Sequence, residues 1–264
     1  MDLGLTGKVA LLSASHRGTG AGTARVLATE GAVVAVHGFE AGQPDAVVAA
    51  IADAGGTAIG VSGPLDSDGD AAAIVDAVEA QVGPVDILVN NYGEPLRHTW
   101  ATPADEWAAG WDRNLLTGVR LTQRVTPGMV ERGWGRVVFL STVGTGRPGR
   151  DNADYYGAKA ALHPVARSLA KELAGTGVTA NVVSPGLIAT DEVRAMVTRR
   201  AEREGVAGSW EEVAAWASRN ILPNLTGRLA TPGDIGRLVA FVAGESGWHL
   251  NGADLRIDGG ALDA

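Results

Sequence analysis

The stretch KVALLSASHRGTG, residues 8–20, restricts the fold more than any other part of the sequence. An apolar run over residues 8–12 predicts a strand, and the alanine-rich residues 20–30 predict a helix. In a glycine-containing turn between a strand and a helix, backbone N–H groups and the helix N-terminus can face the same ligand. This arrangement is suited to binding a pyrophosphate. The order therefore predicts a dinucleotide site, although the turn lacks the common G-x-G-x-x-G pattern. The alternative is a tight structural turn.

The alternation of strand and helix continues along the chain. Apolar runs predict further strands over residues 32–36, 57–61, 85–89, 136–140, 179–183 and 254–257. Longer segments between them predict helices, among them residues 70–82, 112–132 and 155–173. Two-sided apolar strands that alternate with helices predict a single-domain α/β fold, a Rossmann-type doubly wound parallel sheet with helices on both faces. We take residues 1–264 as one domain, in which residues 190–226 form a helical insertion that shapes the substrate site.

Composition excludes several classes of protein and site. The chain of 264 residues carries a net charge of −8, which argues against a nucleic-acid partner. Cysteine is absent, which excludes disulfides and thiolate metal sites, and the five histidines are scattered, so no metal is expected. No apolar run reaches the roughly 18 residues of a membrane span, and no leader is apparent at the N-terminus. We therefore expect a cytoplasmic protein without a membrane partner.

Tyr155 and Lys159 form a Tyr-x-x-x-Lys motif within the predicted helix 155–173. Residues four apart lie on one helix face, so the ammonium group can stand beside the phenol and lower its pKa from about 10. A phenol of lowered pKa can pass a proton to or from a carbonyl or an alcohol. On its own the motif is also compatible with a solvated helix face.

The choice of nicotinamide cofactor depends on the end of the second predicted strand. A site selective for NAD places an acidic residue there to bind the ribose 2′-hydroxyl, but His37, Gly38 and Phe39 occupy the stretch, and Glu40 lies past it. Arg17 in the phosphate turn suits a 2′-phosphate through its forked donors, and His37 can assist. We predict NADP(H) in preference to NAD(H). The alternatives are that Arg17 is a solvated turn residue, and that NAD(H) is bound through Glu40 or backbone groups.

Taken together, these residues and a set of further motifs resemble the classical short-chain dehydrogenase/reductase family over nearly the whole chain. The motifs recur in the family's order: the glycine turn, Asn90-Asn91-Tyr92-Gly93, Asn114, Ser141-Thr142, Tyr155 with Lys159, Ser184-Pro185-Gly186, Gly227-Arg228 and Leu250-Asn251-Gly252. An ordered set of this length is far more specific than any single member.

The resemblance implies a role for each matching residue. Tyr155 would be the general acid in reduction and the base in oxidation, Lys159 would hold the nicotinamide ribose, and Asn114 would anchor a water in a proton relay. The cofactor would be bound by Ser13, Ser15, His16, Arg17, Gly18, Thr19, Gly20, His37, Gly38, Leu65, Asn91, Tyr92, Gly93, Tyr155, Lys159, Pro185, Gly186, Ile188 and Thr190. The structural alternatives are that Asn114 caps or kinks its helix and that Pro185-Gly186 ends a strand.

The family's catalytic serine usually lies thirteen residues before the tyrosine, and that position is Thr142. Threonine supplies the same hydroxyl donor and acceptor. Ser141 is its neighbour, and because adjacent side chains of a strand point to opposite faces, the two cannot both face the substrate unless the backbone turns. We favour Thr142 and keep Ser141 as the alternative.

The chain departs from the family's pattern at several other positions. Ala14 replaces the first glycine of the turn, which fits if the backbone φ is negative there. Tyr92 replaces an alanine beside the cofactor, and Leu65 follows the position of an acidic residue that reads adenine, so adenine recognition would rest on backbone and apolar contacts. Pro164 lies inside the helix of Tyr155 and predicts a kink one turn past Lys159.

The resemblance implies an oxidoreductase that interconverts a ketone and a secondary alcohol, similar to 3-oxoacyl reductases or to sugar and polyol dehydrogenases. It also suggests a homotetramer with helices 112–132 and 155–173 at one interface. The alternative is a catalytically inactive dinucleotide sensor on the same scaffold. The substrate stays open, and candidates for its pocket walls are Glu94, Leu96, Arg97, His98, residues 144–154, Met196, Trp210 and Trp216.

Overall fold

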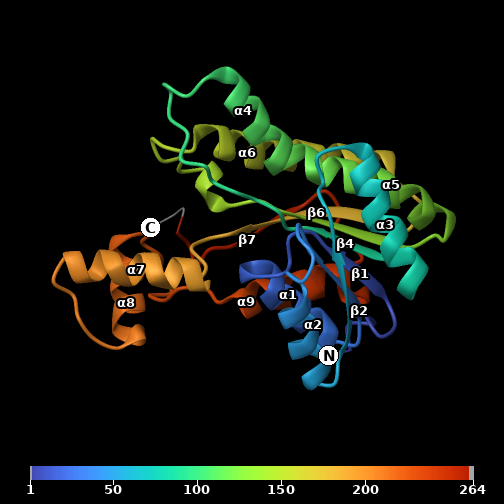
Figure 1. The fold of residues 1–264 in the computed structure, drawn as a ribbon, viewed down its shortest axis with the longest axis horizontal. Coiled ribbons are helices and arrows are strands. Elements are labelled where there is room, and N and C mark those ends of the chain that lie inside the picture. Colours follow the sequence, from blue (N-terminus) through green and yellow to red (C-terminus); the bar gives the residue numbers. More distant parts are fainter. Residues whose placement is uncertain (1, 262–264) are drawn as a thin grey trace.

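Seven parallel strands form one sheet in the computed structural model, which describes residues 2–261 (Figure 1). The sheet order is β3-β2-β1-β4-β5-β6-β7, and every neighbouring pair is parallel. The strands are β1 (Val9–Leu12), β2 (Val33–Gly38), β3 (Thr57–Ser62), β4 (Ile87–Asn90), β5 (Gly135–Leu140), β6 (Val178–Pro185) and β7 (Asp254–Ile257). The predicted Rossmann-type fold and its seven strands are therefore confirmed.

Two layers of helices cover the sheet, one on each face (Figure 1). One face packs against α1 (Gly18–Thr29), α2 (Asp45–Asp53) and α9 (Pro232–Ala243). The other packs against α3 (Asp68–Val82), α5 (Thr117–Glu131) and α6 (Ala153–Glu172). Strands β1, β4, β5 and β6 are buried along their whole length, because alternate apolar side chains enter the two cores.

Two of the predicted helices contain an irregularity, which is a π-helical turn in one and an internal proline in the other. The predicted helix 112–132 begins with a π-helical turn, η1 (Asp112–Leu116), which follows α4 (Ala104–Trp111) and leads into α5. Helix α6 continues through Pro164 without interruption. Short 3₁₀ turns, η2 (Val143–Thr145) and η3 (Glu245–Gly247), complete the elements of the described residues.

Helices α7 (Asp191–Arg203) and α8 (Trp210–Asn220) project from the end of the sheet (Figure 1). They enclose a small core of their own, formed by Val197, Ala201, Val213 and Ala217. Trp210 and Trp216 are partly buried and pack against this core, and the guanidinium of Arg194 lies 4.4 Å from the Trp210 ring centroid. These tryptophans therefore hold the α7–α8 pair together.

The sheet order reverses between β1 and β4, which are neighbours in space although β2 and β3 intervene in the chain. In doubly wound sheets the crevice for a ligand lies at this point, outside the carboxyl ends of the strands. The loops after β1, β4, β5 and β6 all emerge there. Among residues 2–261, no helix combines the length and the apolar character that crossing a bilayer requires.

Candidate active site

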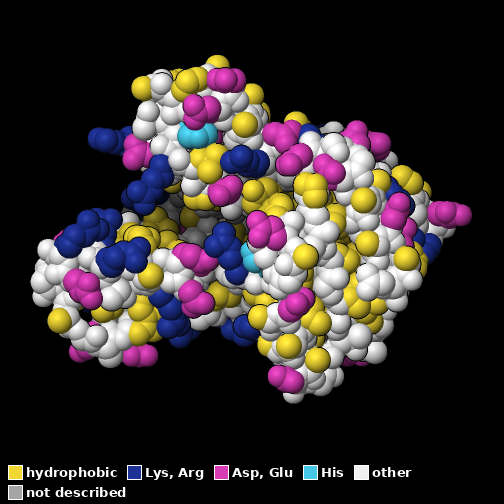
Figure 2. Space-filling view, in the orientation of Figure 1, with side chains coloured by type: hydrophobic (Ala, Val, Ile, Leu, Met, Phe, Trp, Pro, Cys, Tyr) yellow, Lys and Arg dark blue, Asp and Glu magenta, His cyan; other side chains and the backbone are white. Residues whose placement is uncertain are grey.

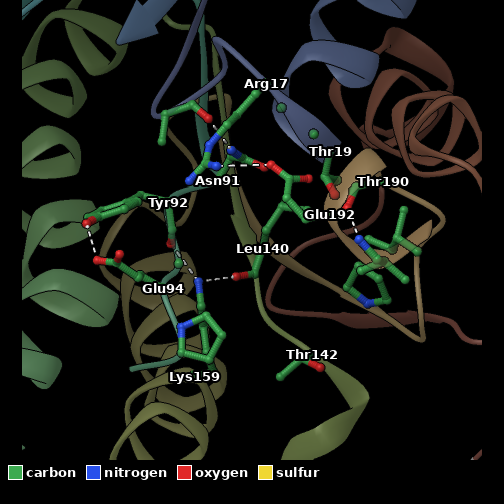
Figure 3. A pocket seen from close by; sticks show the side chains of 18 of the residues that line it. Arg17, Thr19, Asn91, Tyr92, Glu94, Leu140, Thr142, Lys159, Thr190 and Glu192 are labelled. Atoms are coloured by element: carbon green, nitrogen blue, oxygen red, sulfur yellow. Dashed lines mark hydrogen bonds and ion pairs between the residues drawn. The ribbon is translucent and has the colours of Figure 1, made fainter. Parts of the chain in front are cut away.

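A cavity of about 760 Å³ opens at the carboxyl ends of the strands, and Figure 2 shows the hollow beside the α7–α8 pair, with charged side chains of both signs at its rim. The structure brings most of the predicted site residues to this cavity (Figure 3). They are His16, Arg17, Gly18, Thr19, Gly20, Asn91, Tyr92, Gly93, Thr142, Tyr155, Lys159, Pro185, Gly186, Ile188 and Thr190.

Ser13 and Ser15 of the turn point away from the cavity. The Ser13 hydroxyl accepts the backbone N–H groups of Asn91 (3.0 Å) and Tyr92 (3.2 Å). The Ser15 hydroxyl donates to the Leu12 carbonyl (2.8 Å) and accepts from the His37 N–H (3.0 Å). Both hydroxyls therefore join the turn to its neighbouring strands, and neither side chain borders the cavity.

His37 is fully buried and uses both ring nitrogens inside the protein. Nδ1 accepts the Ala14 N–H (3.1 Å), and Nε2 lies 3.0 Å from the Gly63 carbonyl, to which it donates. Burial lowers the pKa of His37 to about 4, so the ring is neutral at pH 7. The prediction that His37 assists a 2′-phosphate is therefore wrong. Gly38 and Leu65 do not border the cavity either, and Leu65 belongs to the core.

Ala14 has a backbone φ of +49°. This is the left-handed region, which favours glycine because a Cβ atom clashes there with the following carbonyl. The expectation of a negative φ at this position is wrong, and the turn carries the strain of a non-glycine residue, about 1 kcal/mol. The buried bonds of Ser13, Ser15 and His37 hold the turn in this conformation.

The turn leads into α1, whose N-terminus has no capping side chain and no acidic residue in its first turn. The first N–H groups of such a helix have no intrahelical partner, so they are available to an anion. Arg17 stands at this N-cap, and its Nη1 lies 3.0 Å from Glu192 Oε1 of α7, across the cavity (Figure 3). Both side chains are more than half exposed, so this ion pair is open to exchange with a ligand.

Lys159 is buried at the opposite end of the cavity and is 2% exposed. Its ammonium nitrogen donates to the Tyr92 carbonyl (2.7 Å) and to the Leu140 carbonyl (2.8 Å) (Figure 3). Burial lowers the pKa of Lys159 to about 7. A Cβ atom on Gly93 would stand 2.8 Å from the Lys159 nitrogen, so the glycine leaves the amine its place.

Tyr155 lines the cavity one helical turn before Lys159. Burial raises the pKa of the Tyr155 phenol to about 12. The expectation that Lys159 lowers this pKa is not met, because the buried Lys159 nitrogen is bonded to two carbonyl groups. The phenol is therefore a proton donor at neutral pH.

Ser141 and Thr142 have different surroundings. The Ser141 hydroxyl donates to the Lys159 carbonyl (2.9 Å) and lies 3.0 Å from His163 Nε2 of α6. The Thr142 hydroxyl accepts the Gly144 N–H (3.1 Å), so its own hydrogen stays available to a ligand. Both residues border the cavity, and they differ in whether the hydroxyl hydrogen is already donated within the protein.

Asn114 is buried in the π-helical turn and is not at the large cavity. Its Oδ1 accepts the Glu94 N–H (2.8 Å), and its Nδ2 donates to the carbonyls of Glu94 (3.2 Å) and Gly110 (2.9 Å). A second cavity of about 10 Å³ lies between Asn114 and Lys159, with room for about one water. The Asn90 side chain borders this cavity, and its Oδ1 has no hydrogen-bond partner among the described residues.

Comparison with known proteins places the chain in a family. A family model described as enoyl-(acyl carrier protein) reductase matches residues 13–261. D-β-hydroxybutyrate dehydrogenase of Cupriavidus necator is 34% identical over 265 residues, which cover 97% of this chain and 98% of that protein. The chain belongs to the short-chain dehydrogenase/reductase family. It is an oxidoreductase that uses a nicotinamide dinucleotide and interconverts a ketone and a secondary alcohol.

Solved structures of the family resemble this chain over its full length. L-sorbose reductase of Gluconobacter frateurii, complexed with NADPH and L-sorbose, has a TM-score of 0.90 and 26% identity and covers all of both chains. A 3-oxoacyl (acyl-carrier-protein) reductase of Agrobacterium tumefaciens with NADP bound has a TM-score of 0.86 and 34% identity, over 98% of this chain and 96% of that one.

Several cavity residues were not predicted to bind the cofactor from the sequence. Phe39 packs against Tyr92 with ring centroids 4.7 Å apart, and the Tyr92 hydroxyl donates to Glu94 (3.2 Å). Burial, together with the charge of Glu94, raises the pKa of Tyr92 to about 12. Phe39 had a local signal, since it follows the carboxyl end of a strand. The remaining unpredicted wall residues are Ala14, Gln43, Pro95, Leu140, Leu187, Glu192 and Val193, and Glu94 was predicted only as a substrate wall.

Proposed function

We propose that the chain is an NADPH-preferring carbonyl reductase and alcohol dehydrogenase in which Tyr155 transfers the proton. One observation carries this proposal: the uncapped N-terminus of α1 and the side chains of Thr142, Tyr155 and Lys159 border the same cavity. The helix N-terminus is suited to the pyrophosphate of a dinucleotide, and the three side chains are suited to a reacting carbonyl. Hydride transfer requires that the dinucleotide and the carbonyl compound share one cavity. The glycine turn and the free helix N-terminus fit a dinucleotide.

The dinucleotide, when bound, supplies or accepts the hydride. Tyr155 donates its phenolic proton to the carbonyl oxygen during reduction and takes it back during oxidation. The available hydrogen of Thr142 is donated to the same oxygen, which holds the carbonyl in place and stabilises its developing negative charge. The Lys159 amine borders the same cavity one helical turn from Tyr155, and in its protonated form it would favour the phenolate that forms as the proton leaves.

Reprotonation of Tyr155 needs a path from solvent. We assign Asn114 to this path, because the cavity of about 10 Å³ joins its surroundings to those of Lys159 and suits one water. The side chain of Asn114 itself is used to hold the loop after β4. Its part in the relay is therefore to fix the position of the backbone that borders this water site.

Preference for NADPH rests on Arg17, whose side chain is 68% exposed at the cavity. The two solved relatives described above bind NADPH or NADP. NAD(H) is the second candidate, because Arg17 is already paired with Glu192 and a 2′-phosphate would have to compete with that carboxylate. The segment after β2, where the ribose would lie, is held by the Gln43 side chain, which accepts the N–H groups of Phe39 and Glu40. Arg17→Ala should weaken NADPH binding about tenfold and NADH binding little, measured by nucleotide fluorescence. Unchanged affinity for both nucleotides would favour NAD(H).

As the substrate class we propose a 3-oxoacyl compound or a keto sugar, because the solved relatives include a 3-oxoacyl (acyl-carrier-protein) reductase and L-sorbose reductase. We further propose a cytoplasmic homotetramer. Three apolar side chains are exposed on the helices of the sheet face that also carries α6, and they support an assembly through that face. They are Trp111 on α4, Leu116 on η1 and Val130 on α5. Light scattering of the purified protein tests the tetramer.

The proposed activity is tested by adding a panel of 3-oxoesters, keto sugars and diketones to the protein with NADPH and following absorbance at the nicotinamide band. Turnover of any member supports the reductase. Tight NADPH binding without turnover of any member would favour the dinucleotide sensor, the alternative that the same fold allows. Absence of binding to either nucleotide would contradict the site itself.

A further inference from the structure

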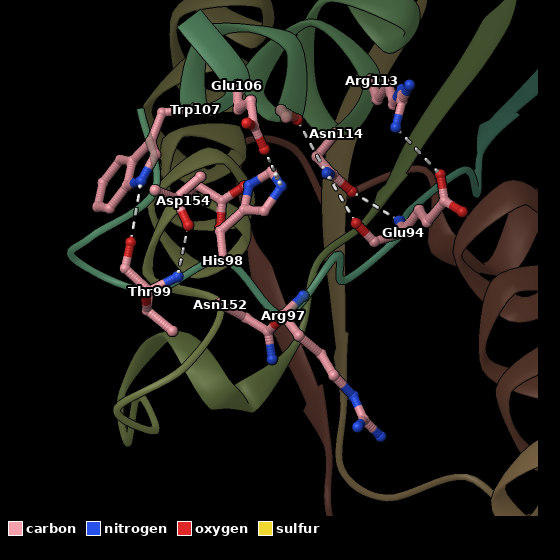
Figure 4. A network of polar contacts seen from close by, with 12 residues as sticks. Glu94, Arg97, His98, Thr99, Glu106, Trp107, Arg113, Asn114, Asn152 and Asp154 are labelled. Carbon is pink, nitrogen blue, oxygen red and sulfur yellow. Dashed lines mark hydrogen bonds and ion pairs between the residues drawn. The ribbon is translucent and has the colours of Figure 1, made fainter. Parts of the chain in front are cut away.

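Two hydrogen bonds, each donated by a backbone N–H group, join the loop between β4 and α4 to the residue before α6 (Figure 4). The Asn152 N–H donates to the His98 carbonyl (2.7 Å), and the Arg97 N–H donates to Asn152 Oδ1. Arg97 and Asn152 both have positive φ, +59° and +65°. Non-glycine residues persist in this region only where the surroundings determine them, and they concentrate at functional sites.

A side-chain pair lies directly beside these contacts. Asp154 is 1% exposed, and its Oδ2 accepts a hydrogen bond from His98 Nδ1 at 2.8 Å. Its other oxygen, Oδ1, has no partner among the described residues, so His98 is the group that compensates the buried carboxylate. A carboxylate acceptor requires that Nδ1 carry the hydrogen. His98 Nε2 lies 3.7 Å from the exposed carboxylate of Glu106 on α4.

The pair also reaches α4, the helix that precedes the π-helical turn of Asn114. A Cβ atom on Gly110 of α4 would stand 2.3 Å from Asp154 Oδ2, so a glycine is required for α4 to approach this closely. The Gly110 carbonyl in turn accepts from Asn114. Asp154 therefore lies where α4, α6 and the loop of residues 94–99 meet.

Tyr155 is the next residue of the same helical turn. The first intrahelical bond of α6 runs from the Tyr156 N–H to the Asn152 carbonyl, so Tyr155 lies in the turn whose N–H groups have no helical partner. The N-cap residue, Asn152, makes no capping bond with its side chain. Contacts with the 94–99 loop take the place of a cap and keep this turn from fraying.

We propose that the His98–Asp154 pair positions Tyr155, by fastening the first turn of α6 to the loop whose residues Glu94 and Pro95 line the cavity. The pair makes no contact with the reacting atoms. Its effect is to fix the phenol relative to the part of the cavity wall that Glu94 and Pro95 form. This inference rests on the proposed role of Tyr155 in proton transfer.

The test compares His98→Ala, Asp154→Ala and the double variant with His98→Asn, which keeps an N–H donor near the position of Nδ1. Loss of a hydrogen bond to a buried charged group should lower kcat about tenfold in each alanine variant, with NADPH affinity unchanged. The double variant should be no slower than the singles, since both remove one interaction. His98→Asn should restore most of kcat. Glu106→Gln is the matched control and should stay within about twofold of wild type.

Peptide hydrogen exchange supplies a readout that does not depend on finding the substrate. In both alanine variants, peptides over residues 94–103 and 150–158 should exchange about tenfold faster, while β5 is unchanged. Unchanged exchange in these peptides would overturn the proposal. Equal loss of NADPH affinity and kcat in His98→Ala, without rescue in His98→Asn, would also overturn it in favour of a general structural role. Failure of the wild type to bind nucleotide or reduce any ketone would contradict the proposed function, and the exchange result would still decide whether the pair fastens the helix.

Discussion

The two ends of the cavity present their chemistry in different ways. In the turn of residues 13–20, the hydroxyls of Ser13 and Ser15 point inward, and the glycine backbone and the N-terminus of α1 face the cavity. At the other end the side chains of Thr142, Tyr155 and Lys159 themselves line the wall. Substitutions should therefore act through backbone conformation at the turn and through lost chemical groups at the catalytic end.

The largest effect is expected from Tyr155→Phe. The substitution removes one oxygen from the cavity wall and leaves the backbone of α6 as it is. Loss of the proton donor should lower kcat by about 10²–10⁴, while NADPH affinity stays within a few-fold of wild type. NADPH-dependent turnover by the variant at more than a tenth of the wild-type rate would exclude Tyr155 as the proton donor.

The neighbours Thr142 and Ser141 should respond differently to loss of the hydroxyl group. Thr142→Val keeps the shape of the side chain but removes the hydroxyl whose hydrogen is available to a ligand, and should lower kcat about 10²-fold or more. Ser141→Ala removes a hydroxyl that is committed to the Lys159 carbonyl and should lower kcat only a few-fold. Steady-state kinetics of both variants decide the assignment, and the reverse order would transfer the role to Ser141.

Lys159→Met tests the cost of burying an amine at the catalytic end. Burial lowers the pKa of Lys159 in the folded protein to about 7, whereas the unfolded chain keeps the usual value of 10.5. Between these values the unfolded state binds more protons, so the stability of the wild type rises with pH. The variant should be more stable than wild type at pH 7 by roughly 1–3 kcal/mol, and this advantage should shrink towards pH 10.

Urea unfolding of both proteins at pH 7, 8.5 and 10 measures that difference. The two hydrogen bonds of the Lys159 amine to carbonyl groups oppose the effect, because methionine leaves both acceptors buried. A stability difference that does not change with pH would show that the amine keeps its proton in the folded protein throughout this range.

The smallest effect is expected at the turn, from Ala14→Gly. Glycine relieves the left-handed strain at φ +49°, but it also makes the unfolded chain more flexible. The balance should raise the free energy of unfolding by up to about 1 kcal/mol and leave kcat unchanged. A thermal melt of the variant below that of the wild type would mean that the turn relaxes the strain in another way.

Some residues of the site could be placed from the sequence, and others could not. The spacing of Tyr155 and Lys159 follows from helix geometry, and both reach one cavity. The inward direction of Ser13, Ser15 and His37 could not be predicted, because it depends on acceptors and donors from β1, β2 and β4. Glu192 lies 175 residues from Arg17 in the chain, and no local pattern joins them.

Periodicity and turn chemistry are local properties of a sequence, so the apolar runs and glycine turns were enough to predict the parallel sheet, its seven strands and the order of motifs along it. Only the folded structure shows whether the Ser141 or the Thr142 hydroxyl keeps a hydrogen available to a ligand. It also brings His98 to Asp154, which lies 56 residues away in the chain. Those properties depend on burial and on partners from distant segments, and a short stretch of sequence contains neither.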